Sequence, residues 1–190
     1  MTLSVEELSS IARRYWRPDR AFDFSPENSP EAERFLDLWE QELKRMDQWR
    51  ALLREWGAAL PDFSIGNATA TCDACFRGVV YPKTEGGPRT HDWRVVGCVS
   101  ILAPVYVVYG VRYGQRDDER TQGRALFDAL PPEMQAPADI VASKIEVAFG
   151  FAALPRDIAE TPIPLVVERK EPPQTTLFHA LFTSVPERVP

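Results

Sequence analysis

A long stripe of apolar residues in the first third of the chain predicts an amphipathic helix. It opens with Ser29-Pro30-Glu31, which supplies a capping serine, a proline at the first helical position and an acid near the positive end of the helix dipole. Apolar side chains then recur at helical spacing before Gly57, at Phe35, Trp39, Leu43, Met46, Trp49, Leu53 and Trp56. Such a stripe is typical of a helix packed against a core. A shorter amphipathic helix is predicted over residues 5–15.

Beyond Pro61 the hydrophobic pattern changes from a period of about 3.6 residues to a period of about 2, which favours strands. β-branched and aromatic residues dominate the predicted strands, which cover residues 69–81, 93–102 and 105–113. The last two are separated only by Ala103-Pro104, so we expect them to form an antiparallel hairpin. The charged residues 115–122 form either a loop or the start of a helix that runs to about Leu130.

The C-terminal third, residues 130–184, mixes proline-marked elements. Pro137-Ala138-Asp139 opens a predicted helix that runs through Phe149. Residues 145–151 also alternate as a strand would, but Ala, Glu and Lys at the polar positions favour the helix. Late strands are predicted over residues 164–169 and 176–184. Together these elements predict one α+β domain, residues 1–190, with helices in residues 1–60 packed on a largely antiparallel sheet, and the sheet with additional helices in residues 61–190.

Composition narrows the class of protein. The 190 residues are 44% hydrophobic and 26% charged, close to the averages for folded domains. No apolar run approaches the roughly 20 residues of a membrane-spanning helix, and the first ten residues are too polar for a secretory signal, so we expect a cytoplasmic location and no membrane partner. Three cysteines, an odd number, agree with a reducing compartment. The net charge of -6 argues against nucleic acid and favours a basic protein partner.

The cysteines raise the possibility of a metal site. Cys72 and Cys75 have the spacing of half a zinc site, and His91 and Cys98 could complete it. A complete site normally shows a second close pair, whereas Cys98 lies in a strand-like run where cysteine is ordinarily a core residue. A reactive Cys-x-x-Cys pair normally starts a helix, and this pair lies in β-prone sequence. We therefore predict no metal and no cofactor, and keep a small metal-dependent enzyme or regulator built on these four residues as the alternative.

Catalytic patterns are equally sparse. His91 beside Asp92 could act as a base for Cys72 or Cys75, but such a set can be drawn in almost any chain. His179, between two phenylalanines, is predicted to be a partly buried strand residue. No glycine-rich phosphate loop follows a predicted strand. The chain is therefore predicted not to be an enzyme and to have no catalytic residues.

The order of elements from Val105 onward resembles that of bacterial immunity proteins, which neutralise a cognate polymorphic or contact-dependent toxin. The resemblance covers about the last half of the chain and rests on the strand of residues 105–110, the turn Leu130-Pro131-Pro132-Glu133, the segment of residues 145–150, the connectors Leu154-Pro155 and Pro162-Ile163-Pro164, and the closing residues 176–182. It implies tight stoichiometric binding of a toxin and carries no catalytic residues.

An acidic inhibitor of this kind would be steered towards a basic toxin, for example a nuclease, because charge complementarity chiefly raises the association rate. The candidate partner-binding residues are the acids Asp117, Asp118 and Glu119 and the aromatic residues Trp93 and Tyr113, all expected to be exposed, since aromatic side chains dominate interface hot spots. A structural or adaptor subunit with a different partner is a third possibility.

Overall fold

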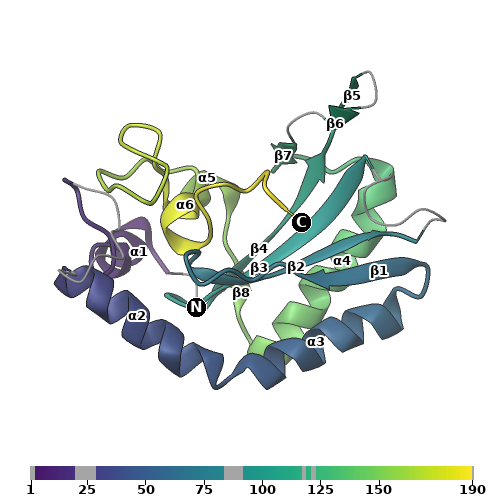
Figure 1. Cartoon of the computed structure of the whole chain (residues 1–190), viewed down its shortest axis with the longest axis horizontal. Coiled ribbons are helices and arrows are strands. Elements are labelled where there is room, and N and C mark those ends of the chain that lie inside the picture. The colour runs from purple at the N-terminus through teal and green to yellow at the C-terminus, as the bar shows by residue number, and fades with distance from the viewer. Residues whose placement is uncertain (1–2, 20–28, 84–91, 117–118, 121–122, 190) are drawn as a thin grey trace.

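A largely antiparallel sheet organises the computed structural model, which describes residues 3–19, 29–83, 92–116, 119–120 and 123–189 (Figure 1). Its strand order is β1-β2-β3-β4-β7, with β8 added in parallel to β4. The strands are β1 (Phe63–Asn67), β2 (Cys75–Pro82), β3 (Trp93–Ser100), β4 (Val105–Arg112), β7 (Arg124–Leu126) and β8 (Ala152–Ala153). A separate two-stranded ribbon, β5 (Gln115–Arg116) and β6 (Glu119–Arg120), projects beyond the sheet in Figure 1.

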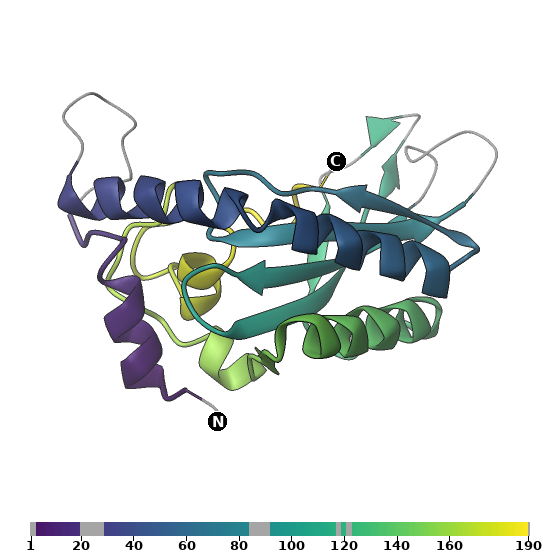
Figure 2. The ribbon, with the colours of Figure 1, turned by 90° about the horizontal axis from the view of Figure 1, so that it is seen from below.

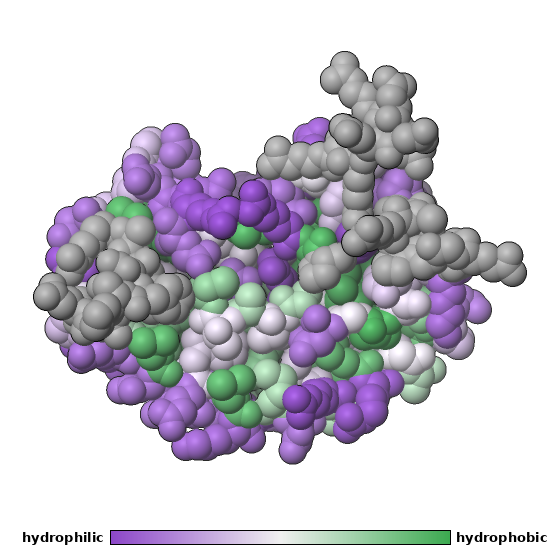
Figure 3. Space-filling model, in the orientation of Figure 1, coloured by the Kyte–Doolittle hydropathy of each residue, from purple (hydrophilic) through white to green (hydrophobic). Residues whose placement is uncertain are grey.

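Six helices surround the sheet in the described residues: α1 (Val5–Ala12), α2 (Pro30–Leu43), α3 (Met46–Ala59), α4 (Pro132–Phe149), α5 (Arg156–Ala159) and α6 (Leu177–Leu181). The α+β class, with N-terminal helices packed on a mostly antiparallel sheet, is therefore as the sequence predicts. Among the described residues, no helix has the length and apolar character needed to cross a membrane. In Figure 3 hydrophilic side chains surround a paler and more apolar middle, over the sheet.

Helices α3 and α4 cover one face of the sheet, as Figure 2 shows. Glycines make the close approach possible, because a Cβ at Gly78 would lie 2.4 Å from the Trp56 ring and one at Gly97 would lie 2.7 Å from Cγ1 of Val141. Trp56 of α3 is completely buried and contacts Trp49 edge to face, at 5.7 Å between ring centroids. The predicted apolar stripe is thus core, as its period indicates.

The C-terminal segment, residues 175–189, covers the opposite face. The backbone N–H of Ala74 donates to the carbonyl of Phe182 at 2.8 Å, and the Tyr109 hydroxyl donates to the carbonyl of Pro186 at 3.0 Å. The indole N–H of Trp16, just after α1, donates to the carbonyl of Ala180. Side-chain and backbone hydrogen bonds therefore fix this late segment to parts of the chain that lie between 77 and 164 residues earlier.

The hairpin of β3 and β4 is confirmed, with Val99 opposite Tyr106 in its register. The predicted first strand, residues 69–81, begins only at Cys75. The helix predicted to run unbroken to Trp56 is two helices, because the chain turns at Lys44 and Arg45, where neither glycine nor proline marks the break.

Four expectations for the later chain are wrong. Residues 124–126 form strand β7, so the alternative of a helix that runs from the charged residues to about Leu130 does not hold. Helix α4 starts at Pro132 and holds Pro137 inside it, so the proline at the first helical position is Pro132. Residues 164–169 contribute only isolated bridges, and residues 177–181 form α6, so His179 is a helical residue.

Candidate functional site at the open edge of strand β4

The outer edge of β4 is only partly covered. Strand β7 pairs with β4 from Gly110 to Arg112, and β8 pairs with Val105 and Tyr106. Within the described chain, residues 107–109 therefore have no partner strand on this side. Unpaired strand edges of this kind offer backbone hydrogen-bonding groups to another chain.

The backbone of Val108 faces this gap. Leu154 donates its N–H to the carbonyl of Tyr106 at 2.8 Å, so the backbone groups of Tyr106 point outward from the sheet. Because backbone groups alternate in direction along a strand, the N–H and C=O of Val108 point the same way. The gap thus presents one donor and one acceptor between the ends of β7 and β8.

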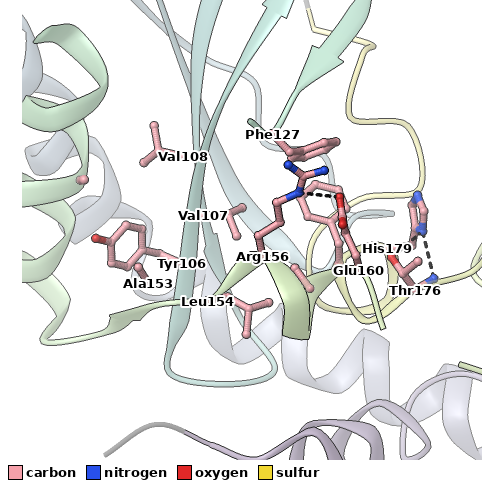
Figure 4. A pocket seen from close by; sticks show the side chains of 13 residues that line it. Tyr106, Val107, Val108, Phe127, Ala153, Leu154, Arg156, Glu160, Thr176 and His179 are labelled. Carbon is pink, nitrogen blue, oxygen red and sulfur yellow. Dashed lines mark hydrogen bonds and ion pairs between the residues drawn. The ribbon is translucent and has the colours of Figure 1, made fainter. Parts of the chain in front are cut away.

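A pocket of about 440 Å³ lies at this gap (Figure 4). Most of its surface is apolar, as is typical of binding pockets. Since no strand closes the edge, the pocket draws residues from both faces of the sheet and from α4, α5 and α6. Its lining comprises Tyr106, Val107, Val108, Phe127, Ala142, Ala153, Leu154, Arg156, Ala159, Glu160, Thr176, Phe178 and His179.

Phe127 forms an aromatic wall of the pocket and is 38% exposed. Its ring lies 4.8 Å from that of Phe178 in an edge-to-face contact and 5.1 Å from that of Tyr109. Both partners are buried, so they hold an exposed aromatic ring in place. Ordered, exposed aromatic side chains are typical of interfaces and ligand sites.

Acidic groups outnumber basic groups around the pocket. Arg156 pairs with Glu160, at 2.8 Å from its Nε to Oε1, and also with Asp128. The Tyr106 hydroxyl donates to Oε1 of Glu146 at 2.6 Å, and burial together with this bond raises the pKa of Tyr106 well above its usual value. Lys170 is the other basic group with an influence here. Arg156 and Glu160 of the lining thus balance each other, and Asp128 and Glu146 add carboxylates that contact lining side chains.

His179 serves as a cap and not as a base. Its Nδ1 accepts a hydrogen bond from the backbone N–H of Thr176 at 3.1 Å and lies 3.0 Å from the Thr176 hydroxyl oxygen, in a capping box at the start of α6. Burial, with a smaller contribution from Lys170, lowers the pKa of His179 to about 4. A neutral imidazole whose Nδ1 is already engaged is a poor partner for activating Thr176.

The aromatic residues singled out in the sequence lie elsewhere. Trp93 is half-buried at the start of β3 and packs against Phe63, at 6.2 Å between ring centroids. Tyr113 was expected to be exposed, and this is wrong: it is only 8% exposed, because its ring lies under Arg94 at 4.9 Å and its hydroxyl donates to the carbonyl of Val189. Tyr113 is therefore a packing residue in this structure.

Of the three acids that the sequence singles out, the structure describes only the backbone of Glu119. Glu119 begins β6 and pairs in register with Arg116 of β5, while Asp117 and Asp118 fall outside the described residues. Trp93 and Tyr113, which the structure describes, do not line the pocket at the edge of β4. Their role in partner binding stays a prediction.

The three cysteines of the alternative metal cluster do not come together as one set of ligands in the described chain. Cys75 and Cys98 are completely buried together, and burial, followed by the hydrogen bond between the two thiols, raises the pKa of Cys75. Cys72 turns instead towards Asp73 and Glu168, with ligand atoms within 4.8 Å of one another. His91 lies outside the described residues.

The group around Cys72 is already engaged with protein partners. Asp73 pairs with Arg77 at 3.2 Å, and Glu168 accepts a hydrogen bond from the Ser184 hydroxyl at 2.8 Å. Burial, and then the charges of Glu168 and Asp73, raise the pKa of Cys72 to about 11, so its thiol stays protonated near neutral pH. This cluster is therefore arranged as a polar contact that anchors the C-terminal segment.

In the comparisons with known proteins, no family model, no curated protein and no solved structure matches this chain. Function therefore has to be argued from the site.

Proposed function

We propose that this protein is a cytoplasmic immunity protein, which neutralises a cognate bacterial toxin by forming a stoichiometric complex with it. The observation that carries the proposal is the open edge of β4, where the backbone of Val108 has no partner strand among the described residues and meets an apolar pocket. Such an edge suits recognition of another polypeptide, because backbone bonds give affinity and the pocket gives specificity.

The charge of the protein supports a basic partner. The chain carries 28 acidic and 22 basic residues, and carboxylates also exceed cations around the pocket. A basic toxin such as a nuclease would be drawn to this surface at an elevated rate, and the effect would weaken as salt is added. The acids Asp117, Asp118 and Glu119 would add to the negative charge that attracts such a partner.

The chemistry of the pocket supports binding over turnover. Its histidine has a pKa of about 4, and its arginine is paired with two carboxylates. A general base active near neutral pH needs a pKa closer to 7. The lining groups are suited to hold a ligand in one orientation.

Co-expression provides the direct test of function. The protein would be produced together with the product of the gene immediately upstream, with cell survival and co-purification as readouts. We expect the neighbour alone to arrest growth, and the pair to grow and to co-purify as a complex. A harmless neighbour that does not bind would contradict the proposal.

A further inference from the structure

The gap in the edge of β4 is too short for an added strand. Residues 107–109 span about 10 Å at roughly 3.3 Å per residue, and β7 and β8 occupy the edge on either side. One or two residues of a partner fit between them in extended conformation. An occupant must therefore enter as a short loop or chain end and not as a long paired strand.

The pocket behind the gap suits a flat apolar group. Tyr106, Phe127 and Phe178 place three aromatic rings in its lining, and Leu154 and Val107 add aliphatic contacts. Aromatic rings pack favourably edge to face or offset against one another, adding to the effect of apolar burial. The exposed Phe127 leaves one of these rings accessible from outside.

Polar groups fix how such a side chain would be presented. The N–H and C=O of Val108 can pair with the backbone of the residue that carries the ring. Asp128 and Glu160 share a single guanidinium, that of Arg156, so the mouth of the pocket favours a positive charge beside the ring.

We propose that the pocket takes a single aromatic side chain from an extended loop of the toxin, with a lysine or arginine next to it in sequence. This inference rests on the proposed function, because it names the feature of the partner that the site recognises. The aromatic ring fills the pocket. Hydrogen bonds to the backbone of Val108 determine how deeply the ring enters.

The decisive variant is Ala153→Trp, which places a large side chain in the pocket from within the protein. Ala153 lines the pocket but is itself exposed, so the new ring need not disturb the core. Ala58→Trp is the matched control, because Ala58 is an exposed alanine on α3 and is not part of the pocket lining. Circular dichroism and thermal melting establish that both variants are folded.

The first readout uses N-acetyl-tryptophanamide as the probe and amide NMR shifts as the signal. We expect saturable shifts at Val108 and Leu154 in the wild type and in Ala58→Trp, and loss of these shifts in Ala153→Trp. N-acetyl-leucinamide should bind at least several-fold more weakly. Shifts that persist in Ala153→Trp, or equal binding of the two probes, would overturn the inference.

The second readout uses the toxin itself and separates the two proposals. We expect Ala58→Trp to protect cells, and Ala153→Trp to lose protection with complex affinity reduced at least 100-fold. If Ala153→Trp protects as well as the wild type, the aromatic anchor is wrong and the immunity function stands. If the neighbour is harmless while the probe still binds at Val108, the pocket stands and the immunity function fails.

A second variant keeps the inference testable should Ala153→Trp fail to fold. Phe127→Ala removes the accessible aromatic wall from a residue that is already 38% exposed. We expect at least a tenfold loss of probe affinity without loss of the fold. Unchanged probe affinity would overturn the inference.

Discussion

The guanidinium Nη2 of Arg77 lies 3.2 Å from Oδ2 of Asp73 beneath the C-terminal segment, and the two side chains are only 7% and 3% exposed. Arg77 also donates from Nε to the carbonyl of Ala68 and from Nη1 to the hydroxyl of Thr183. Because Thr183 lies in the C-terminal segment, this buried pair fastens that segment to β2.

Removing one charge of this pair should be costly. Asp73→Asn preserves the shape of the side chain but leaves Arg77 buried without its carboxylate, so we expect the free energy of unfolding to fall by about 3–5 kcal/mol. Urea denaturation measures the loss. Asp47→Asn is the control, because Asp47 pairs with Arg50 on the surface and should change little. Equal effects of the two variants would show that the buried pair does not anchor the fold.

The close packing of α3 and α4 on the sheet predicts opposite effects for two glycines. A Cβ at Gly97 would lie 2.7 Å from Cγ1 of Val141 and 2.8 Å from the Trp56 ring, so Gly97→Ala should destabilise by about 1–3 kcal/mol. Gly57 lies within α3, and its Cβ would make an ordinary contact of 3.7 Å with Ile65. Gly57→Ala should therefore stabilise by about 0.5–1 kcal/mol. Thermal melting of both variants shows whether each substitution raises or lowers the stability of the protein. A stabilising Gly97→Ala would be inconsistent with this packing.

His179 should make stability depend on pH. Burial, followed by Lys170, lowers the pKa of His179 from 6.5 to about 4 in the folded protein. Between these values the unfolded chain binds a proton that the folded protein does not, so the free energy of unfolding falls as pH decreases from about 7 to about 4. The half-buried position limits this loss to roughly 1–2 kcal/mol.

His179→Gln isolates that contribution. Glutamine at the third helical position can keep the hydrogen bond to the backbone N–H of Thr176 but does not titrate. Denaturation curves at pH 7 and pH 4.5 should show a smaller decrease for the variant than for the wild type. Parallel decreases would mean that His179 is not the titrating group.

The acidic triplet should act on the rate of association. Changing Asp117, Asp118 and Glu119 to lysine would reverse the sign of the ribbon and should slow toxin binding about tenfold or more at low salt. Stopped-flow association at two salt concentrations measures the effect, which should shrink at high salt. A rate that the triple variant leaves unchanged would remove these residues from the interface.

Local pattern was sufficient for much of the architecture. The apolar spacing through Trp49 and Trp56 predicted α3, and the alternation on either side of Ala103-Pro104 predicted the hairpin of β3 and β4. The α6 segment was missed because buried residues surround this short helix, so periodicity could not separate helix from strand. The break after α2 was missed because no glycine or proline marks it.

The pocket could not be predicted from the sequence, because it forms between the ends of strands β7 and β8 along the edge of β4. Its walls come from β4, from Phe127, from the segment after β8 and from α6, which are distant in sequence. The gap exists because β7 and β8 cover different parts of β4, a property of tertiary pairing alone.

Titration of the toxin against this protein tests the central claim most directly. The toxin's activity would be measured after adding increasing amounts of the protein at concentrations far above the dissociation constant. Stoichiometric binding predicts a linear loss of activity that is complete at one equivalent, and a 1:1 complex by light scattering. If a small fraction of an equivalent of the protein inactivates the toxin, and the loss of toxin activity increases with time, the protein acts by turnover. That result would contradict the account.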